Sequence, residues 1–234
     1  MAYQLQSEDW SLIWDEHLKR YVYSEPRRAK MILKIMAKLG IKADTVVELG
    51  CGSLRDGGYL SKKYEVIGLD FNKKVLTETK KVYSRCHRVV ADAAFLPLKD
   101  KSVDVGFSSG LLIYFDNKQA LEIVREQARV IKSLVIFFVH NKTNLWEIPT
   151  VKFRGIRDRL YRFRRFSVKE LGRLLKNYER LIIVPFGATH PFYAMAWFRP
   201  VYSLIKRLGF DKKLKWLHSV TEWCVIVDLR RDGC

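Results

Sequence analysis

A run of six large apolar residues, 134–139 (LVIFFV), constrains the fold most strongly. It lacks the alternation of apolar and polar residues that marks a strand with one solvated face. Continuous runs of this kind are typical of strands covered on both faces, which occur in mostly parallel sheets flanked by helices. We therefore expect the run to be an inner strand of an α/β sheet.

The rest of the chain alternates between strand and helix patterns. Apolar spacing predicts a helix over 10–40, interrupted at Pro26. Asn72, Asp116 and Ser167 are expected to cap helices that reach about residues 84, 131 and 178. Strands are predicted at 45–49, 65–69, 87–91, 102–108, 134–139, 181–184 and 223–229. This order predicts the α/β class, with a doubly wound, mostly parallel seven-stranded sheet.

Three short motifs follow three successive strands, where an open α/β sheet binds its ligands. Gly50-Cys51-Gly52 follows the first strand, and glycines there allow a close backbone approach. Asp70 closes the second strand, about 20 residues on, and suits the hydroxyl groups of a ribose. Asp92-Ala93 follows the third, where a carboxylate and an N–H suit an adenine edge. Together they predict a nucleoside-containing ligand.

These motifs resemble those of class I S-adenosylmethionine (SAM) dependent methyltransferases. The resemblance extends over about residues 40–185 and is strongest to the broad methyltransferase type 11 group, which includes ubiquinone and menaquinone biosynthesis enzymes. It implies a Rossmann-like fold and SAM as the cofactor. The implied division of the single domain 1–234 is an N-terminal helical cap (1–40), a SAM-binding core (41–140) and two basic, aromatic insertions over the acceptor site (141–166 and 187–222).

The resemblance also implies roles for individual residues. The methionine part of SAM would lie against Glu48, Gly50, Cys51 and Gly52, with Ser108 and Ser109 on the same side. Asp70 would bind the ribose and Phe71 would pack on the adenine, while Asp92 and Ala93 would bind the adenine edge. One departure is Leu54, which stands where the family often has a third glycine. Arg55 then either faces solvent, which we expect, or reaches the SAM carboxylate.

Other nucleotide-binding classes lack their defining residues here. A P-loop needs Gly-Lys-Ser/Thr, and the chain has Gly57-Gly58-Tyr59. A dinucleotide fingerprint needs a third glycine or alanine where Arg55 stands, so a NAD-dependent oxidoreductase is only a remote alternative. The segment after the fourth strand lacks the motif of adenine-N6 methylation. A proton-accepting base is needed only for some acceptors, and Tyr114 and His140 are candidates because each follows a strand end.

The charge is large and uneven. Of 43 Lys and Arg against 25 Asp and Glu, residues 1–140 hold 23 basic and 17 acidic, and residues 141–234 hold 20 and 8. Segment 152–166 alone has seven basic residues with aromatic ones between them, and it is predicted to be a helix. The expected substrate-binding residues are Arg157, Arg162, Arg165, Tyr193 and Trp197.

Such charge predicts an anionic partner. RNA, most simply tRNA, is the first hypothesis for the methyl acceptor. The alternatives are a small or lipid-like molecule, with peripheral membrane contact, and a protein amine such as an N-terminus or lysine. A basic binding protein without catalysis is a further alternative. The residues do not predict an oligomeric state.

The remaining features concern the cellular setting. The four cysteines form no Cys-x-x-Cys pair, so we expect neither a metal site nor a disulfide framework. No stretch has the roughly 20 apolar residues of a transmembrane span. Residues 1–10 lack a signal-peptide pattern, and the low Asn and Gln content is typical of thermophiles. We expect a cytoplasmic protein.

Overall fold

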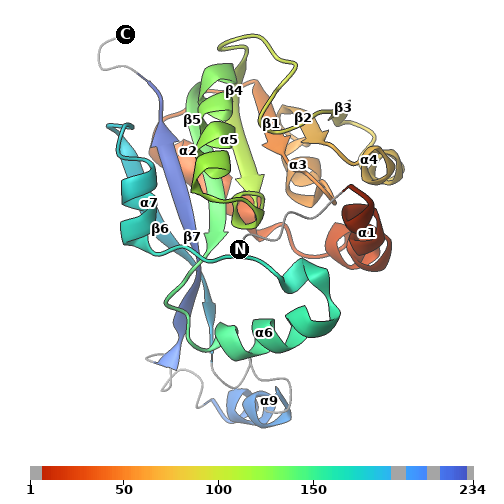
Figure 1. Ribbon diagram of the computed structural model, residues 1–234, viewed down its shortest axis with the longest axis vertical. Helices are drawn as coiled ribbons and strands as arrows, with labels where there is room; N and C mark the ends of the chain where they lie inside the picture. The colour runs from red at the N-terminus through yellow and green to blue at the C-terminus, as the bar shows by residue number, and fades with distance from the viewer. Residues whose placement is uncertain (1–6, 191–198, 210–216, 231–234) are drawn as a thin grey trace.

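The structure is a computed structural model that describes residues 7–190, 199–209 and 217–230 (Figure 1). Its seven strands form one sheet in the order β3-β2-β1-β4-β5-β7-β6. β1 to β5 run parallel, and β7 is antiparallel to both of its neighbours. The predicted fold class is thus confirmed. The strands are β1 (Thr45–Leu49), β2 (Glu65–Asp70), β3 (His87–Val90), β4 (Val103–Ser109), β5 (Ile131–His140), β6 (Leu181–Thr189) and β7 (Ser219–Asp228).

Three helices begin where local capping predicts. Asn72 accepts a hydrogen bond from the Val75 N–H, and Asp116 and Ser167 each form a capping box. Two helices end about four residues earlier than predicted, because their ends depend on packing rather than on a cap. The helices are α1 (Ser7–Val22), α2 (Arg27–Lys38), α3 (Arg55–Leu60), α4 (Lys73–Lys80), η1 (Leu112–Tyr114), α5 (Asn117–Val130), α6 (Glu147–Arg157), η2 (Arg159–Tyr161), α7 (Val168–Leu174) and α9 (Arg199–Arg207).

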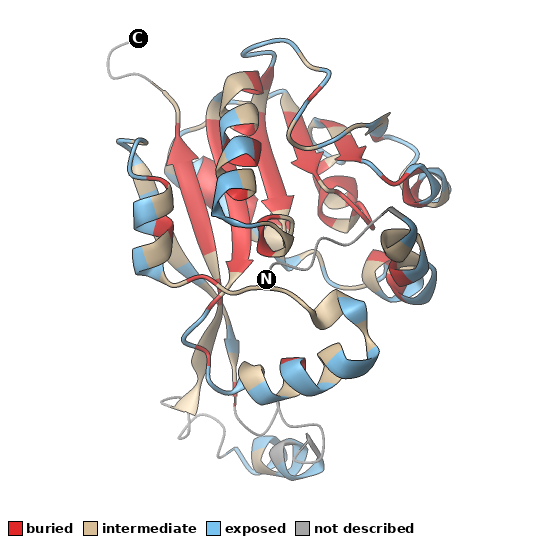
Figure 2. Ribbon diagram, viewed as in Figure 1, coloured by how far each residue is buried: buried red, intermediate tan, exposed pale blue. Residues whose placement is uncertain are grey.

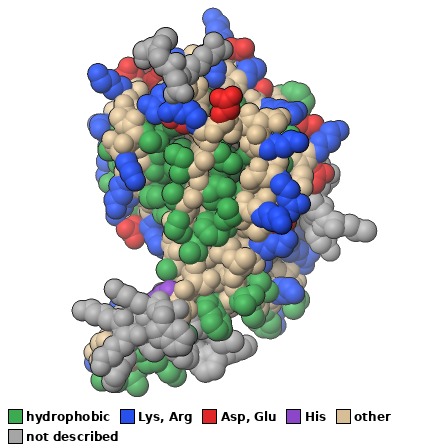
Figure 3. Space-filling view, turned by 90° about the vertical axis from the view of Figure 1, so that its left-hand side faces the viewer, with side chains coloured by type: hydrophobic (Ala, Val, Ile, Leu, Met, Phe, Trp, Pro, Cys, Tyr) green, Lys and Arg blue, Asp and Glu red, His purple; other side chains and the backbone are tan. Residues whose placement is uncertain are grey.

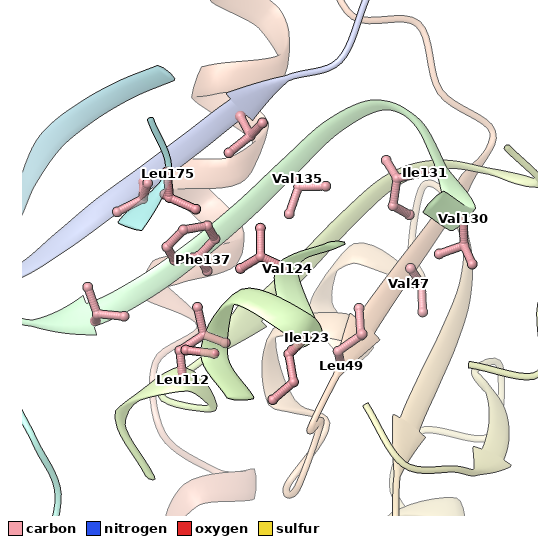
Figure 4. Close-up of a cluster of buried hydrophobic side chains, with 14 of the residues drawn as sticks. Val47, Leu49, Leu112, Ile123, Val124, Val130, Ile131, Val135, Phe137 and Leu175 are labelled. Atoms are coloured by element: carbon pink, nitrogen blue, oxygen red, sulfur yellow. The ribbon is translucent and has the colours of Figure 1, made fainter. Parts of the chain in front are cut away.

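β5 is buried on both faces, as its sequence predicts (Figure 2). Val135 and Phe137 pack with residues of α5 and α7 on one face of the sheet (Figure 4). Ile136 and Phe138 pack with α2 on the other face. The alternating side chains of one strand therefore join two hydrophobic cores, which fixes the sheet between two layers of helices.

The antiparallel edge is longer than predicted. β6 and β7 pair from Leu181 and Val227 to Thr189 and Ser219, so backbone hydrogen bonds carry both strands beyond their apolar runs. The connection between β6 and β7 is therefore residues 190–218, which is shorter than the predicted insertion 187–222. Figure 3 shows the side of the molecule that carries this edge, where apolar side chains gather between groups of Lys and Arg. Ile182 of β6 is 39% exposed there.

Two helical segments cover the edge of the sheet at which β1 to β5 end (Figure 1). α1 lies on one side and α6 with η2 on the other. The Nε2 atom of His17 in α1 lies 2.9 Å from the carboxylate of Asp158, which precedes η2. Asp9 and Arg159 form a second ion pair between these segments. Within the residues that the structure describes, no helix has the length and apolar character needed to span a membrane.

Candidate active site

A cavity of about 590 Å³ opens at the carboxyl ends of the parallel strands. Its walls come from β1, β2, β4, β5 and β7, from the turn after β3, and from α1, α2, α3, η1, α6 and η2. Of the cofactor residues predicted from sequence, Glu48, Gly50, Cys51, Asp70, Phe71, Asp92, Ala93 and Ser109 line it. Gly52 and Ser108 lie just outside this lining. The topology therefore brings together three motifs that are up to about 40 residues apart in the chain.

Three alternate residues of the turn after β1 have a left-handed backbone conformation. Gly50 and Gly52 have positive φ angles of 58° and 45°. Leu54, at the position of the missing third glycine, also has a positive φ of 51°. A positive φ is unfavourable for a residue with a side chain. The side chain of Leu54 is fully buried among core residues, and this burial offsets the cost. The departure from the family pattern thus leaves a tight turn that leads into α3.

Asp70 joins the turn to β2. Its two carboxylate oxygens accept hydrogen bonds from the N–H groups of Gly52 (2.8 Å) and Asn72 (2.9 Å). Burial raises the pKa of this carboxyl group, and the backbone donors oppose that rise. Each oxygen has a second lone pair, so Asp70 still has acceptor capacity toward the cavity. Phe71, the next residue, is 43% exposed, as expected for a side chain that would pack on a ligand.

A charged network forms the deep end of the cavity. Glu48 accepts a hydrogen bond from the Gly57 N–H at 2.8 Å, and burial beside Asp56 raises the pKa of Glu48. Arg55 binds Asp56 at 2.5 Å and has a side chain only 11% exposed. The expectation that Arg55 faces solvent is therefore wrong, because the adjacent carboxylate holds it inside the cavity wall.

A second buried ion pair closes this network, and sequence reasoning missed it. Arg28 of α2 donates two hydrogen bonds to Glu222 of β7, at 2.6 and 3.1 Å. Both side chains line the cavity. The pair lies 194 residues apart, so no local pattern signals it. The attraction of Arg28 is among the causes that lower the pKa of Glu222 despite its burial.

The opposite end of the cavity is aromatic. Trp10 of α1 contacts Tyr114 edge to face, with ring centroids 4.7 Å apart, and Tyr114 meets Phe163 in the same way at 6.4 Å. Tyr21 and Tyr161 add two further rings to the lining. Flat, apolar walls with a few polar groups are typical of pockets for small organic molecules.

The two candidate bases have different surroundings. The Tyr114 hydroxyl donates a hydrogen bond to the Leu160 carbonyl at 2.7 Å, and burial raises its pKa further above the usual range. Both facts favour a structural role for Tyr114. His140 lies at the end of β5, with its Nδ1 atom 3.3 Å from the Glu147 carboxylate. The His140 ring stacks on Phe163 at 4.3 Å between centroids.

Glu147 is a functional candidate that sequence reasoning missed. It is the first residue of α6 and lines the same cavity as His140. A carboxylate on one ring nitrogen of a histidine fixes its tautomer and leaves the other nitrogen able to accept a proton. The signal in sequence was weak, because Glu147 reads as an ordinary acid in the first turn of a helix.

The basic segment 152–166 differs from the prediction. The helix α6 ends at Arg157 and η2 follows, so the segment is not one continuous helix. Phe153 and Ile156 of α6 are 62% and 70% exposed. Arg162 donates hydrogen bonds to the carbonyl oxygens of Gly155 and Ile156 near the end of α6, at 2.6 and 3.2 Å. It therefore holds the chain turn together instead of facing a ligand.

Several other arginines of this segment also have internal partners. Arg154 contacts Tyr161, and Arg159 pairs with Asp9. Arg157 is exposed at the end of α6. Arg165 is largely buried, with its side chain 12% exposed. Two of the predicted substrate-binding residues, Tyr193 and Trp197, lie outside the residues that the structure describes.

Comparisons with known proteins agree with this geometry. A family model described as a methyltransferase domain matches residues 46–133. Malonyl-[acyl-carrier protein] O-methyltransferase of Marinomonas sp. (strain MWYL1) is 32% identical over 134 residues, which are 53% of this chain and 49% of that protein. The chain thus spans about half the length of this curated relative.

Solved structures extend the likeness to nearly the whole chain. A SAM-dependent methyltransferase from Archaeoglobus fulgidus has a TM-score of 0.62 and 16% identity, with 90% of this chain and 97% of that chain covered. Magnesium protoporphyrin IX methyltransferase from Synechocystis PCC 6803, with bound SAM, has a TM-score of 0.59 and 13% identity, with 97% and 99% covered. The chain contains a class I SAM-dependent methyltransferase domain. The resemblance predicted from its motifs is confirmed.

The methyltransferase domain has a cavity that fits its cofactor, SAM. The Ser109 hydroxyl lines the cavity and, like that of Ser108, is buried without a hydrogen-bond partner among the described residues. A Cβ on Gly50 would lie 2.7 Å from Leu111, so only glycine leaves this backbone open. Acidic groups at the deep end of the cavity suit the ammonium group of the methionine part of SAM, and Arg28 and Arg55 suit its carboxylate group. The donor set therefore matches the methionine, ribose and adenine parts of SAM.

Proposed function

We propose that this chain transfers the methyl group of SAM to a small organic molecule. The observation that carries the proposal is the aromatic half of the cavity, which adjoins the cofactor half and is covered by α1, α6 and η2. A cavity of this size and lining encloses a drug-sized ligand rather than a polynucleotide. Besides Phe71, seven Phe, Tyr and Trp residues line the cavity: Trp10, Trp14, Tyr21, Tyr114, Phe115, Tyr161 and Phe163.

The RNA hypothesis loses its main support in the basic segment. Arg162 and Arg159 have intramolecular partners, so they serve to hold η2 against α6 and α1. RNA binding needs basic side chains free to neutralise phosphates. The named relatives also favour the small-molecule alternative. One is named for action on malonyl-[acyl-carrier protein] and another for action on magnesium protoporphyrin IX.

The cofactor residues would act by position. We place the ribose on Asp70, the adenine between Phe71 and Asp92-Ala93, and the methionine end between Glu48, the glycine turn and Ser109. SAM supplies a methyl group already activated by its sulfonium sulfur. The chain's main task is then to hold the acceptor atom in line with that methyl group, and such alignment contributes about 7–11 kcal/mol in favourable cases.

His140 is our proposed proton acceptor. A hydroxyl or amine acceptor forms a bond to the methyl carbon, the carbon–sulfur bond breaks, and the proton of the acceptor moves to the free ring nitrogen of His140, Nε2. Glu147 would hold Nδ1 and stabilise the imidazolium that forms. A positioned base of this kind contributes about 10²- to 10⁴-fold in rate.

Methyl-labelled SAM tests the proposal. The purified full chain is incubated with an extract of the source organism, which is then separated into RNA, protein, lipid and small-molecule pools. We expect label in the small-molecule pool, or in the lipid pool if the acceptor has an acyl chain. Asp70→Ala serves as the blank. Label confined to RNA or to amino groups of proteins would refute the proposal, as would equal label with the blank.

A further inference from the structure

A second cavity, of about 410 Å³, lies beside the acceptor end of the first. We call it the basic cleft. Its walls come from the segment after β5, from α6, from the segment after η2 and from the start of α7. Its lining consists of four basic residues, one acid and one apolar residue: Lys142, Lys152, Arg164, Arg165, Glu170 and Ile148. The cleft therefore has a formal excess of three positive charges.

The acid of the cleft is already engaged. Glu170 accepts hydrogen bonds from the Ser167 N–H at 2.8 Å and from the Ser167 hydroxyl at 2.9 Å, as part of the cap of α7. Its other oxygen accepts a hydrogen bond from Lys142 at 2.9 Å. These donors lower the pKa of Glu170 to about 2. The single negative charge of Glu170 is thus already shared with Lys142.

Among the residues that the structure describes, no carboxylate is hydrogen-bonded to either arginine of the cleft. Arg164 donates to neutral oxygens, the Phe115 carbonyl at 3.1 Å and the Asn117 side chain at 2.7 Å. The carboxylate of Glu147 lies 3.9 Å from Nε of Arg165, which is too long for a hydrogen bond. Its Nε and Nη2 atoms are buried without a hydrogen-bond partner in the described part of the chain.

Such an arrangement is costly in the absence of an anion. A buried donor without a partner costs about 1–3 kcal/mol, and more when it is charged. A ligand with anionic oxygens would relieve this cost, because the planar guanidinium fork matches carboxylate and phosphate geometry.

We propose that the basic cleft binds a phosphate or carboxylate group of the methyl acceptor. Arg165 connects the two cavities, since its guanidinium lies 5.4 Å from the ring centroid of Phe163, which lines the acceptor end. An acceptor whose reactive atom lies near His140 would thus extend its anionic group past Phe163 to Arg165. This inference rests on the proposed function for the nature of the ligand, but the anion site itself does not.

A binding measurement tests the anion site without any acceptor. Inorganic phosphate is titrated into the full chain in the presence of S-adenosylhomocysteine, and binding is followed by calorimetry at low ionic strength. We expect saturable binding that Arg165→Gln weakens at least tenfold, while Arg165→Lys weakens it less. Arg125→Gln is the matched control, because Arg125 is an exposed arginine of α5 outside both cavities. Absence of binding, or equal weakening by Arg165→Gln and Arg125→Gln, would overturn the site.

A second arm tests whether the ligand is a group on the acceptor. The labelled product from the extract experiment is passed over an anion exchanger at neutral pH. Retention supports the proposal, and a neutral labelled product overturns the assignment to the acceptor. The two failures are distinguishable: label in RNA or on protein amino groups refutes the small-molecule function, whereas a neutral small product refutes only this inference. Folding of the Arg165 variants is checked by circular dichroism.

Discussion

Replacement of Gly52 by alanine tests how α1 covers the cofactor turn. Gly52 has a φ of 45°, and a Cβ at this position would lie 2.1 Å from Cζ2 and 2.5 Å from Cη2 of Trp14. Ordinary van der Waals contact begins at 3.4 Å, so the indole ring must move by more than 1 Å. Trp14 belongs to α1 and lines the cavity, so the strain falls on the contact between the N-terminal helix and the turn after β1.

The expected cost has two parts. A side chain in the left-handed region costs about 1–2 kcal/mol. Overpacking against a ring costs about 1–3 kcal/mol. Gly52→Ala should therefore lower the free energy of unfolding by about 2–5 kcal/mol. In a Trp14→Ala background the ring is absent, and Gly52→Ala should cost only the first part, about 1–2 kcal/mol.

Urea unfolding of the two single variants and the double variant gives this coupling directly. Gly172→Ala is the control, since Gly172 lies in α7 and a Cβ there meets no atom within 4 Å. That substitution should stabilise the chain by up to about 1 kcal/mol. If Gly52→Ala costs the same with and without Trp14, the proposed packing of α1 on the turn is refuted.

Three further predictions concern the site and its supports. Asp70→Ala should weaken SAM binding about 10- to 100-fold, because a charge-assisted hydrogen bond is worth about 1.5–3 kcal/mol, and calorimetry showing an unchanged Kd would contradict this. Glu147→Gln should lower kcat about tenfold or more with little change in KM and should lose the Nδ1–H tautomer of His140 in nitrogen NMR, whereas an unchanged tautomer would show that Glu147 does not position the ring. Glu170 has a pKa lowered to about 2 in the folded chain. Its contribution to the free energy of unfolding is therefore fully present above pH 4.5 and is lost as the pH falls toward 2. The difference in unfolding free energy between the native chain and Glu170→Gln should therefore shrink from about 1–2 kcal/mol at pH 6 to near zero at low pH, and a constant difference would refute the reasoning.

Local signals account for what sequence predicted well. Asn72, Asp116 and Ser167 cap their helices as expected, because a cap involves a side chain and a backbone group three residues away. The apolar run of β5 identified the central strand for a similar reason, since burial on both faces leaves no polar position. The ends of α4 and of the β6–β7 pair were less accurate, because packing and strand pairing determine them.

The acceptor end needed the tertiary structure. His140 was a candidate from its place after a strand, but its partner Glu147 is an unremarkable acid in sequence. The arginines of segment 152–166 appeared as one cationic surface. In the folded chain, Arg162 donates hydrogen bonds to backbone carbonyls near the end of α6, and Arg159 forms an ion pair with Asp9. Arg165 has no hydrogen-bonded carboxylate among the described residues.

By itself, the sequence determined the α/β class, the order of the strands along the chain and the cofactor, because the glycine turn, Asp70 and Asp92 each act through local backbone geometry at a strand end. Only the tertiary structure decided which acidic group each arginine pairs with, how α1 and η2 enclose the acceptor end, and that Arg28 binds Glu222. The physical reason is that ion pairs and cavities depend on side chains brought together across the fold, and residue type alone does not specify their partners.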